Sequence, residues 1–370
     1  MRAFWHGAYG ASPANNQVTY NFLTADMQCG WSGYEKTTTT NPGRCTPLTD
    51  DVEITELRVW ITTAPGASKS WTFAVRDDAV TTAASVTISG ASAVSGGWTG
   101  SVTIAAGSLA NLISTPSGTP AGTGQMHWII TYQTAGSFYL AIGGGQTANT
   151  GSVTYPQMSG CADAGAQTSA TEWAQLAPTG FSVTKLGIVN CSQVGGGTNT
   201  VVVRKNNTTD STGVTMTSGV PAIGSITPFA VAAGDTFILK MTPAGGAAWG
   251  NFSMCATIVP DTDGEVVVCF GGGAGPSTSA TTYEGPQGLG NGAWNGTENL
   301  VAYRFLPCTL KKLYVLLSAA PGSGKSWAVT VREQGVDTAL TTSIATAATS
   351  GNDTTHTETV TVGELIAVKA

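Results

Sequence analysis

The segment LRVWITTAPGASKSWTFAVR, residues 57–76, returns with few changes as LYVLLSAAPGSGKSWAVTVR at residues 313–332. In both copies apolar residues alternate with polar ones on either side of a Pro-Gly pair, which is typical of two β-strands joined by a turn. A divergent copy, LGIVNCSQVGGGTNTVVVR, occupies residues 186–204. The segment therefore predicts a repeated strand–turn–strand unit, and we expect each copy to be a β-hairpin.

The second copy contains Gly-Lys-Ser at residues 324–326, which is the ending of a phosphate-binding loop. Such a loop needs another Gly five residues before the last one, and it leads from a strand into a helix. Here Ala319 holds that position and a strand-like alternation follows, while the first copy has Ser68 in place of the last Gly. We therefore expect hairpin tips at residues 64–70 and 320–326, with no bound nucleotide.

The three copies end on Arg76, Arg204 and Arg332, which are spaced 128 residues apart. A period this long corresponds to a whole domain. Short runs rich in Val, Ile, Thr and aromatic residues, separated by Gly, Ser, Pro and Asn, fill each period and indicate β-sandwiches. We expect an all-β chain of three tandem antiparallel β-sandwiches that are jelly-roll-like. The expected parts are an N-terminal strand or arm at 1–14 and sandwiches at 15–135, 136–261 and 262–370.

The two ends of the chain raise a question of completeness. The first two expected sandwiches close with the strands QMHWIITY (125–132) and NFSMCATIV (251–259). The same period places a third closing strand after Ala370, so we expect the third sandwich to lack its last strand. The segment MRAFWHGAY (1–9) resembles a surplus closing strand, which one subunit could donate to the third sandwich of the next. A fragment of a longer array of repeats is the alternative.

Composition disfavours several classes of partner. Charged residues make up 10% of the chain, against about 25% in typical soluble domains. The net charge is −6 and basic residues form no patch, so we expect no nucleic-acid partner. No run approaches the length of about 18 apolar residues that a membrane-spanning helix needs, so we expect no membrane partner. A polar but weakly charged surface suits lateral packing between subunits.

Residues capable of catalysis are scattered. His6, His127 and His356 fall in different repeats at positions that do not correspond. Their spacing predicts neither a catalytic triad nor a metal cluster, and we name no catalytic residue and no cofactor. The chain is expected not to be an enzyme, since a glycan hydrolase would need two carboxylates facing each other across a cleft.

The sequence contains two smaller candidate sites. PDTDGE places Asp261, Asp263 and Glu265 at alternate positions, and oxygen ligands with this spacing can hold calcium. A solvated turn between the second and third sandwiches is the alternative. Cys29 and Cys45 flank a Thr- and Gly-rich loop, and a disulfide there would hold the loop closed.

Aromatic residues outside the alternating strands are candidates for subunit contacts, because Tyr and Trp are enriched at protein interfaces. Together with the aromatic residues of the N-terminal strand, the candidates are Phe4, Trp5, Tyr9, Trp31, Tyr34, Tyr283 and Trp294. Exposed rings in Gly- and Asn-rich loops could also stack on sugars, so a glycan ligand is the alternative.

The repeated unit at 57–76 and 313–332, followed by GVDTAL and SGNDTTH within residues 335–356, resembles β-sandwich repeats of tailed-phage and environmental viral structural proteins. The resemblance implies a non-enzymatic building block of a virion, such as a head decoration, fibre or tail-associated protein. Such a protein would self-associate into a homo-oligomer or filament, beside other virion proteins, in a virion or an extracellular assembly. A subunit of a non-viral extracellular filament or sheath and a carbohydrate-binding adhesin are the alternatives.

Overall fold

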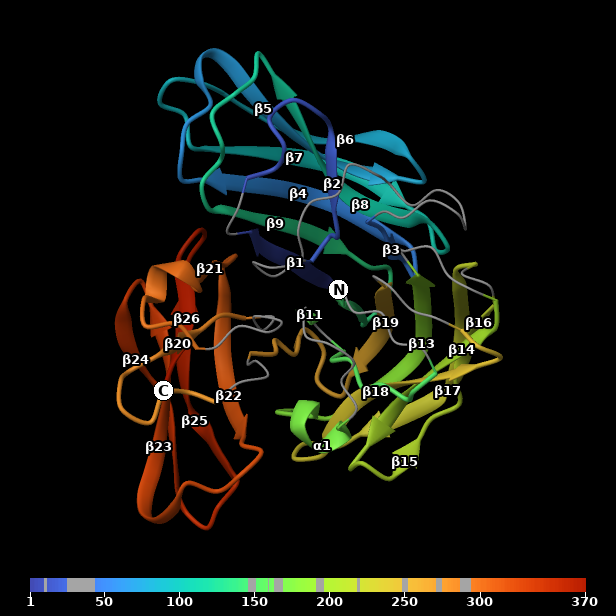
Figure 1. The fold of residues 1–370 in the computed structure, drawn as a ribbon, viewed down its shortest axis with the longest axis vertical. Coiled ribbons are helices and arrows are strands. Elements are labelled where there is room, and N and C mark those ends of the chain that lie inside the picture. The colour runs from blue at the N-terminus through green and yellow to red at the C-terminus, as the bar shows by residue number, and fades with distance from the viewer. Residues whose placement is uncertain are drawn as a thin grey trace.

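The structure is a computed structural model, and it describes residues 1–9, 12–24, 44–145, 151–158, 160–162, 169–190, 196–217, 220–247, 252–270, 275–286 and 294–370. Nearly all regular structure in these residues is β-strand. The described helical elements are α1 (Ala170–Trp173) and a single 3₁₀ turn (Glu298–Leu300). Figure 1 shows three lobes that meet near the middle of the molecule, coloured blue to teal, green to yellow, and orange to red. The all-β prediction is confirmed.

The first lobe, residues 1–133, has two antiparallel sheets. One has the strand order β1–β9–β4–β7, and the other has the order β2–β8–β5–β6 with β3 paired to β8. The bounds are β1 Arg2–Tyr9, β2 Thr19–Asn21, β3 Thr46–Pro47, β4 Val52–Ile61, β5 Gly66–Asp77, β6 Val80–Gly90, β7 Ser95–Ile104, β8 Leu109–Ser117 and β9 Met126–Gln133.

The second lobe, residues 139–260, repeats this plan. One sheet has the order β11–β10–β19–β13–β17, in which β10 and β11 are parallel, and the other has the order β12–β18–β14–β15 with β16 paired to β14. The bounds are β10 Tyr139–Gly145, β11 Gly160–Ala162, β12 Gln175–Leu176, β13 Phe181–Asn190, β14 Thr198–Lys205, β15 Thr209–Asp210, β16 Val214–Thr217, β17 Ala222–Val231, β18 Thr236–Ala244 and β19 Phe252–Pro260.

The third lobe, residues 265–370, is smaller. One sheet has the order β20–β26–β23–β24 with β21 paired to β26, and the second sheet consists of β22 and β25. The bounds are β20 Tyr283–Glu284, β21 Tyr303–Arg304, β22 Cys308–Leu316, β23 Gly322–Glu333, β24 Val336–Thr346, β25 Ser350–Val360 and β26 Leu365–Lys369.

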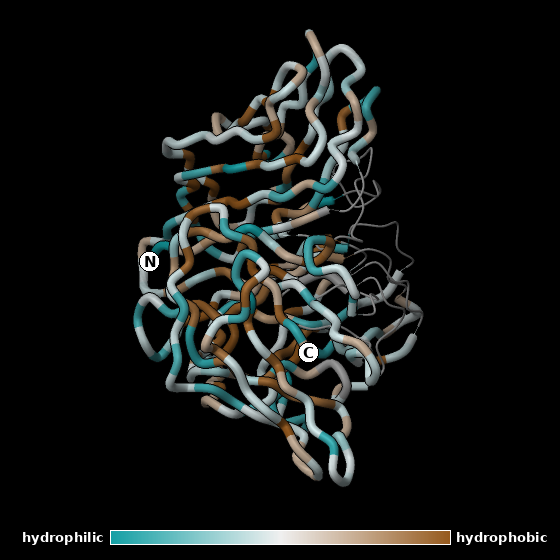
Figure 2. Tube along the Cα trace, turned by 90° about the vertical axis from the view of Figure 1, so that its left-hand side faces the viewer, coloured by the Kyte–Doolittle hydropathy of each residue, from teal (hydrophilic) through white to brown (hydrophobic). Residues whose placement is uncertain are grey.

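Alternating side chains build the core of each lobe, because successive residues of a strand point to opposite faces of its sheet. In the first lobe Leu57 and Val59 of β4 and Trp71 and Phe73 of β5 are all fully buried. Each side chain of this size contributes about 1.5–3 kcal/mol when it leaves water. Figure 2 shows hydrophobic segments mainly inside the lobes, with polar ones around them.

The expected hairpins at the repeated segment are wrong. β4 belongs to one sheet of the first lobe and β5 to the other, so residues 57–76 cross between two sheets. The same holds for β13 and β14 in the second lobe and for β22 and β23 in the third. Alternation identifies each strand but not its partner. The neighbours of β4 are β9 and β7, which lie more than thirty residues farther along the chain.

The three repeat arginines occupy matching places, as the period predicts. Arg76 pairs with a residue of β8, Arg204 with a residue of β18 and Arg332 with a residue of β26. Each guanidinium lies over a tyrosine ring at 5.4–5.8 Å from the ring centroid, a distance at which a cation is attracted to the ring face. The long apolar stems therefore lie along the sheet. The jelly-roll connections and the limits of the tandem sandwiches stay predictions.

The expectation that residues 1–14 form a surplus arm is corrected at β1. This strand pairs along its whole length with β9, from Arg2 opposite Gln133 to Tyr9 opposite Met126. It therefore corresponds to β10, which pairs with β19 in the same way. A Cβ on Gly7 would lie 2.2 Å from the ring of Trp128, so only glycine lets β1 lie this close. β1 is the outer strand of the first lobe.

Candidate strand-docking site

The third lobe lacks a neighbour that the other two lobes have. β4 lies between β9 and β7, and β13 lies between β19 and β17. In the third lobe β22 pairs with β25, and no strand among the described residues pairs with its other edge. Figure 1 shows β22 on the side of the orange lobe that faces the green and yellow lobe. The free edge of β22 is the candidate site.

Matching side chains differ in burial between the first and third lobes. Leu57 and Val59 are fully buried, whereas Leu313 and Val315, which hold the same places in the repeat, are only half-buried. The difference has a clear source, because β9 lays Ile130 opposite Leu57 and Trp128 opposite Val59. Without such a strand, the apolar side chains of β22 keep part of their surface in water.

A cavity of about 1380 Å³ adjoins this edge. Val315 and its neighbours on β22 line one side, and Leu176 of β12 lines the side of the second lobe. Phe4 of β1, residues 263–270 and the core residues Val329 and Val331 of β23 also line it. The backbone NH of Val267 donates a hydrogen bond of 3.2 Å to the Tyr139 hydroxyl, which fixes the start of the third lobe against the second. The cavity therefore lies where all three lobes meet.

Glu265, one of the acidic residues that line the cavity, is paired with two lysines of β22. The Glu265 carboxylate lies 2.8 Å from Lys311 Nζ and 2.7 Å from Lys312 Nζ, and Lys312 also donates to the Thr179 hydroxyl at 3.3 Å. Burial alone would raise the pKa of Glu265, but hydrogen bonds from the two lysines and Thr179 outweigh it and lower the pKa to about 2. Glu265 is thus the counter-ion of two lysines of β22, and the bond from Lys312 to Thr179 joins β22 to the second lobe.

The calcium hypothesis gains no support from this geometry. Asp261 and Asp263 are exposed, whereas Glu265 is turned toward the two lysines. Within the described ranges no three His, Cys, Asp or Glu side chains gather as metal ligands would. The turn between the second and third lobes is the interpretation that fits.

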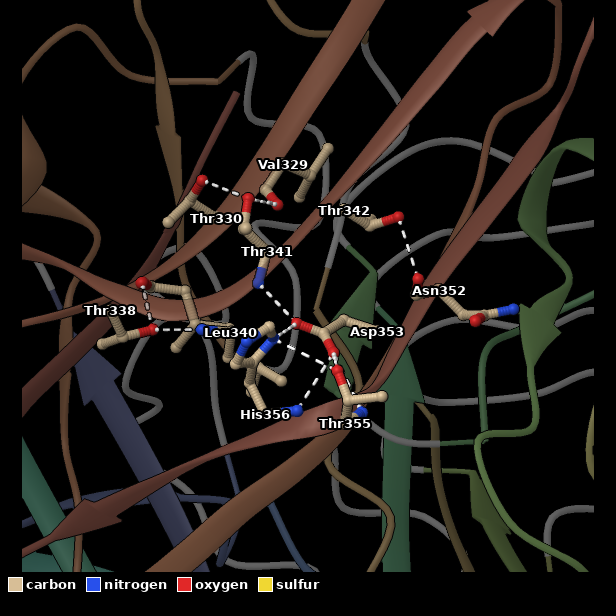
Figure 3. Close-up of polar contacts among 11 residues, drawn as sticks. Val329, Thr330, Thr338, Leu340, Thr341, Thr342, Asn352, Asp353, Thr355 and His356 are labelled. Atoms are coloured by element: carbon tan, nitrogen blue, oxygen red, sulfur yellow. Dashed lines mark hydrogen bonds and ion pairs between the residues drawn. The ribbon is translucent and has the colours of Figure 1, made fainter.

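The paired edge of β22 is tied to the other sheet at Asp353, which lies on β25 opposite Leu313. This buried carboxylate on β25 accepts hydrogen bonds from the backbone NH groups of Thr341, Thr355 and His356 at 3.0–3.1 Å, and His356 Nδ1 lies 2.8 Å away (Figure 3). Burial alone would raise the pKa of Asp353, but these contacts outweigh it and hold the pKa well below its usual range. Because Thr341 lies on β24, the group joins the two sheets at this side and leaves the other edge of β22 open.

Two histidines are part of the contact between the first and third lobes. The His6 ring lies 5.5 Å from the Tyr303 ring and 5.1 Å from the Phe305 ring, and the His127 ring lies 6.2 Å from Tyr303. Burial, followed by the neighbouring charge of Arg304, lowers the pKa of His127 to about 4. Burial, followed by the neighbouring His127, lowers the pKa of His6 to about 3. Sequence reasoning missed this pair because the two residues lie far apart in the chain.

The structure places the aromatic candidates for subunit contacts in different surroundings. Trp5 is buried and stacks on Tyr132 with ring centroids 4.1 Å apart, so it belongs to the core of the first lobe and not to a subunit contact. Phe4 packs edge-on against Phe305 at 5.7 Å. The Tyr283 ring lies under the guanidinium of Arg332.

The remaining candidates are placed only in part. Trp294 lines the cavity, and the backbone of Tyr9, at the end of β1, pairs with Met126 of β9. Trp31, Tyr34 and Cys29 lie outside the described residues. Cys45 is buried, and its pairing with Cys29 stays a prediction. Of the residues that form the site, sequence reasoning named Phe4, Trp294 and Glu265 but not the half-buried face of β22.

Comparison with known proteins adds little. No protein-family model matches the sequence, and no curated protein matches it. Among solved structures, a chain from the T13 IBDV viral particle is similar at 9% identity, covering 100% of this chain and 76% of that chain, with a TM-score of 0.21. Dimeric latent PorU from Porphyromonas gingivalis is similar at 9% identity, covering 88% of this chain and 32% of that chain, with a TM-score of 0.21. Likeness this low carries no argument about function.

One further observation concerns membranes. Among the described residues, no helix has the length and apolar character needed to cross a bilayer.

Proposed function

We propose that this chain is a non-enzymatic structural building block that self-associates through β contacts between subunits. The observation that carries the proposal is the free edge of β22, with Leu313 and Val315 half-buried beside it. An unpaired edge presents a row of NH and CO groups that another strand can satisfy, and natural proteins cover or charge such edges when they are not used. The apolar face beside this edge favours its use.

In finer terms we propose a component of a virion, such as a head decoration, fibre or tail-associated protein, located in a virion or an extracellular assembly. Support comes from the resemblance of the repeated segment at 57–76 and 313–332 to viral β-sandwich repeats. The low charged fraction of 10% also suits tight packing between subunits. A subunit of a non-viral filament or sheath would use the same edge, so microscopy of the native particle distinguishes the two.

Nothing in the described residues favours the adhesin alternative. The face of the Tyr283 ring is occupied by Arg332, whose guanidinium carbon lies 5.4 Å from the ring centroid, so this ring has one face fewer for a sugar.

The test compares the assembly of the purified protein with that of two lysine variants, by light scattering over a range of concentrations and by negative-stain microscopy. Val315→Lys puts a charge on the apolar face of β22. Val336→Lys is the matched control, because this valine lies in the same lobe and is 67% exposed. We expect assembly of the parent and the control, and a monomer for Val315→Lys. A parent that stays monomeric at every concentration would refute the proposal.

A further inference from the structure

Two of the three contacts between lobes use the same elements. The second lobe meets the first where the outer face of β19 packs on residues that follow β3. Cys255 Sγ lies 3.3 Å from the Thr49 hydroxyl, and the Thr257 hydroxyl donates to the Thr49 hydroxyl at 2.8 Å. β3 in turn pairs with β8, the last strand before β9. A closing strand on one lobe therefore docks on a short strand of the next.

The contact between the first and third lobes follows the same rule. His127 lies on the outer face of β9, and it packs against Tyr303 at the start of β21. β21 pairs with β26 just as β3 pairs with β8, so the two short strands correspond. The closing strand of the first lobe thus docks on the third, as that of the second lobe docks on the first.

The third contact is the one between the third lobe and the second. Among the described residues, the third lobe has no closing strand to make it. The matching short strand of the second lobe is β12, which pairs with β18. Lys312 of β22 reaches Thr179, just beyond β12, at 3.3 Å. Residues of β22 and β12 both line the cavity of about 1380 Å³, which lies beside β22 where β9 and β19 lie beside β4 and β13.

We propose that this cavity is a docking groove for an extended strand of another polypeptide chain, which pairs with the free edge of β22 and packs its outer face on β12. The strand also pairs on its far side with residues 266–270, which line the cavity. These residues lead into the third lobe as β1 and β10 lead into the first two, and both of those strands pair with the closing strand of their lobe. The occupied groove would have the strand order of the other two lobes.

The two strands that fill the matching places define the chemistry of the occupant. β9 has 8 residues and β19 has 9, which at about 3.3 Å per residue span roughly 26–30 Å and match the 9 residues of β22. The side chains of β9 that face the core are all large and apolar, and those of β19 are apolar throughout. They are Met126, Trp128, Ile130 and Tyr132 in β9, and Phe252, Met254, Ala256 and Ile258 in β19.

A hydroxyl residue recurs at one position on the other face. Thr131 lies opposite Glu56 of β4, and Thr257 lies opposite Lys185 of β13. Lys312 of β22 holds the matching place, because it precedes Leu313 as Glu56 precedes Leu57. The occupant therefore carries four alternating apolar residues and, in the register of Lys312, a Ser or Thr that can accept a hydrogen bond from its ammonium group.

The inference that another chain supplies the strand rests on the proposed function. A subunit in an assembly meets neighbouring chains at high local concentration. A strand added in this way continues two contacts that already exist within the molecule. It satisfies the backbone groups along β22 and buries Leu313 and Val315 as β9 buries Leu57 and Val59. The groove thus selects by backbone pairing and by alternate side chains, as other strand-adding sites do.

The experiment adds synthetic strands to the full chain. One peptide copies residues 125–133, QMHWIITYQ, with a solubilising tail, and the control peptide has the same composition with its apolar residues grouped at one end. Fluorescence anisotropy measures binding to the parent, to Val315→Lys and to Val336→Lys, and hydrogen exchange reports protection of backbone amides. We expect the patterned peptide to bind the parent and Val336→Lys and to protect the amides of β22 and of residues 266–270. Val315→Lys should bind roughly a hundredfold more weakly or worse, because its charge would be buried without a partner.

The outcomes separate the two proposals. Absence of binding to the parent, or binding without protection in β22, overturns the groove, even if microscopy finds assemblies that support the proposed function. Binding with protection by a parent that never assembles supports the groove and refutes the proposed function. Equal binding of the control peptide also overturns the groove, since alternation is what the site is expected to read.

Discussion

Acid should loosen the contact between the first and third lobes through His6 and His127. Both rings are buried against Tyr303, and neither nitrogen of His6 has a hydrogen-bond partner among the described residues. The positive charge of Arg304 on β21 acts on His127. Burial lowers the pKa of His6 from 6.5 to about 3 and that of His127 from 6.5 to about 4. The folded chain therefore keeps both rings neutral at acidities where the unfolded chain protonates them.

The sign and size follow from proton linkage. Below pH 6.5 the unfolded chain binds protons that the folded chain does not, so the free energy of unfolding falls as the pH falls from 6.5 toward 4. One pKa unit corresponds to about 1.4 kcal/mol, so at about pH 5 each histidine costs about 2 kcal/mol and the pair about 4 kcal/mol. A loss this large is a substantial fraction of the stability of an ordinary domain.

Urea unfolding at about pH 7.5 and about pH 5 measures the effect. We expect the parent to lose about 4 kcal/mol more than a His6→Phe/His127→Phe variant over this interval, with each single variant in between. Val336→Lys is the control, because this valine is 67% exposed and the new side chain does not titrate between these pH values. The reasoning would be refuted if the parent and the double variant lost the same free energy, since the acid effect would then come from other groups.

Two further predictions concern the third lobe. Asp353→Ala leaves the backbone NH groups of Thr341, Thr355 and His356 without their acceptor, so we expect a loss of about 3 kcal/mol at neutral pH, measured by urea unfolding. In the parent this stabilisation fades as the pH falls below about 4 toward the depressed pKa of Asp353, and an equal acid loss in the variant would contradict this assignment. Calorimetry with ATP and GTP should give no heat of binding, because residues 320–326 lead into β23 rather than into a helix. A saturable heat that Lys325→Ala abolishes would show this to be wrong.

Sequence reasoning located the strands because alternation and repetition are local properties. The spacing of Arg76, Arg204 and Arg332 placed equivalent strands correctly, since matching core positions in the three lobes constrain the same residue types. Sequence reasoning did not predict which strands pair with one another. A strand with apolar residues on one face fits a hairpin and a crossing between sheets equally well, so the pairing of β4 with β9 depends on the rest of the chain.

The site was predictable only in outline. The repeat indicated that the third lobe is open, and the half-buried Leu313 and Val315 agree with that expectation. The same reasoning misread residues 1–9. Trp5 makes β1 resemble a closing strand in sequence, but β1 is the opening strand of the first lobe, and its Trp5 ring stacks on Tyr132 of the closing strand β9. The alternate carboxylates near Glu265 suggested calcium, whereas the contacts of Glu265 with Lys311 and Lys312 were not predicted. Contacts between lobes have no local signature.

The hydrogen bonds around Asp353 have a consequence for how fast a strand could be exchanged. They hold β24 and β25 together on the closed side of the third lobe, so the receiving side is already shaped before a strand arrives. Nearly all of the conformational entropy lost on docking then comes from the incoming strand, at about 1–2 kcal/mol for each residue that becomes ordered. β-branched residues reduce this loss because their side chains have few χ1 rotamers to lose. Once docked, such a strand leaves only when many hydrogen bonds break together, which gives a long-lived connection.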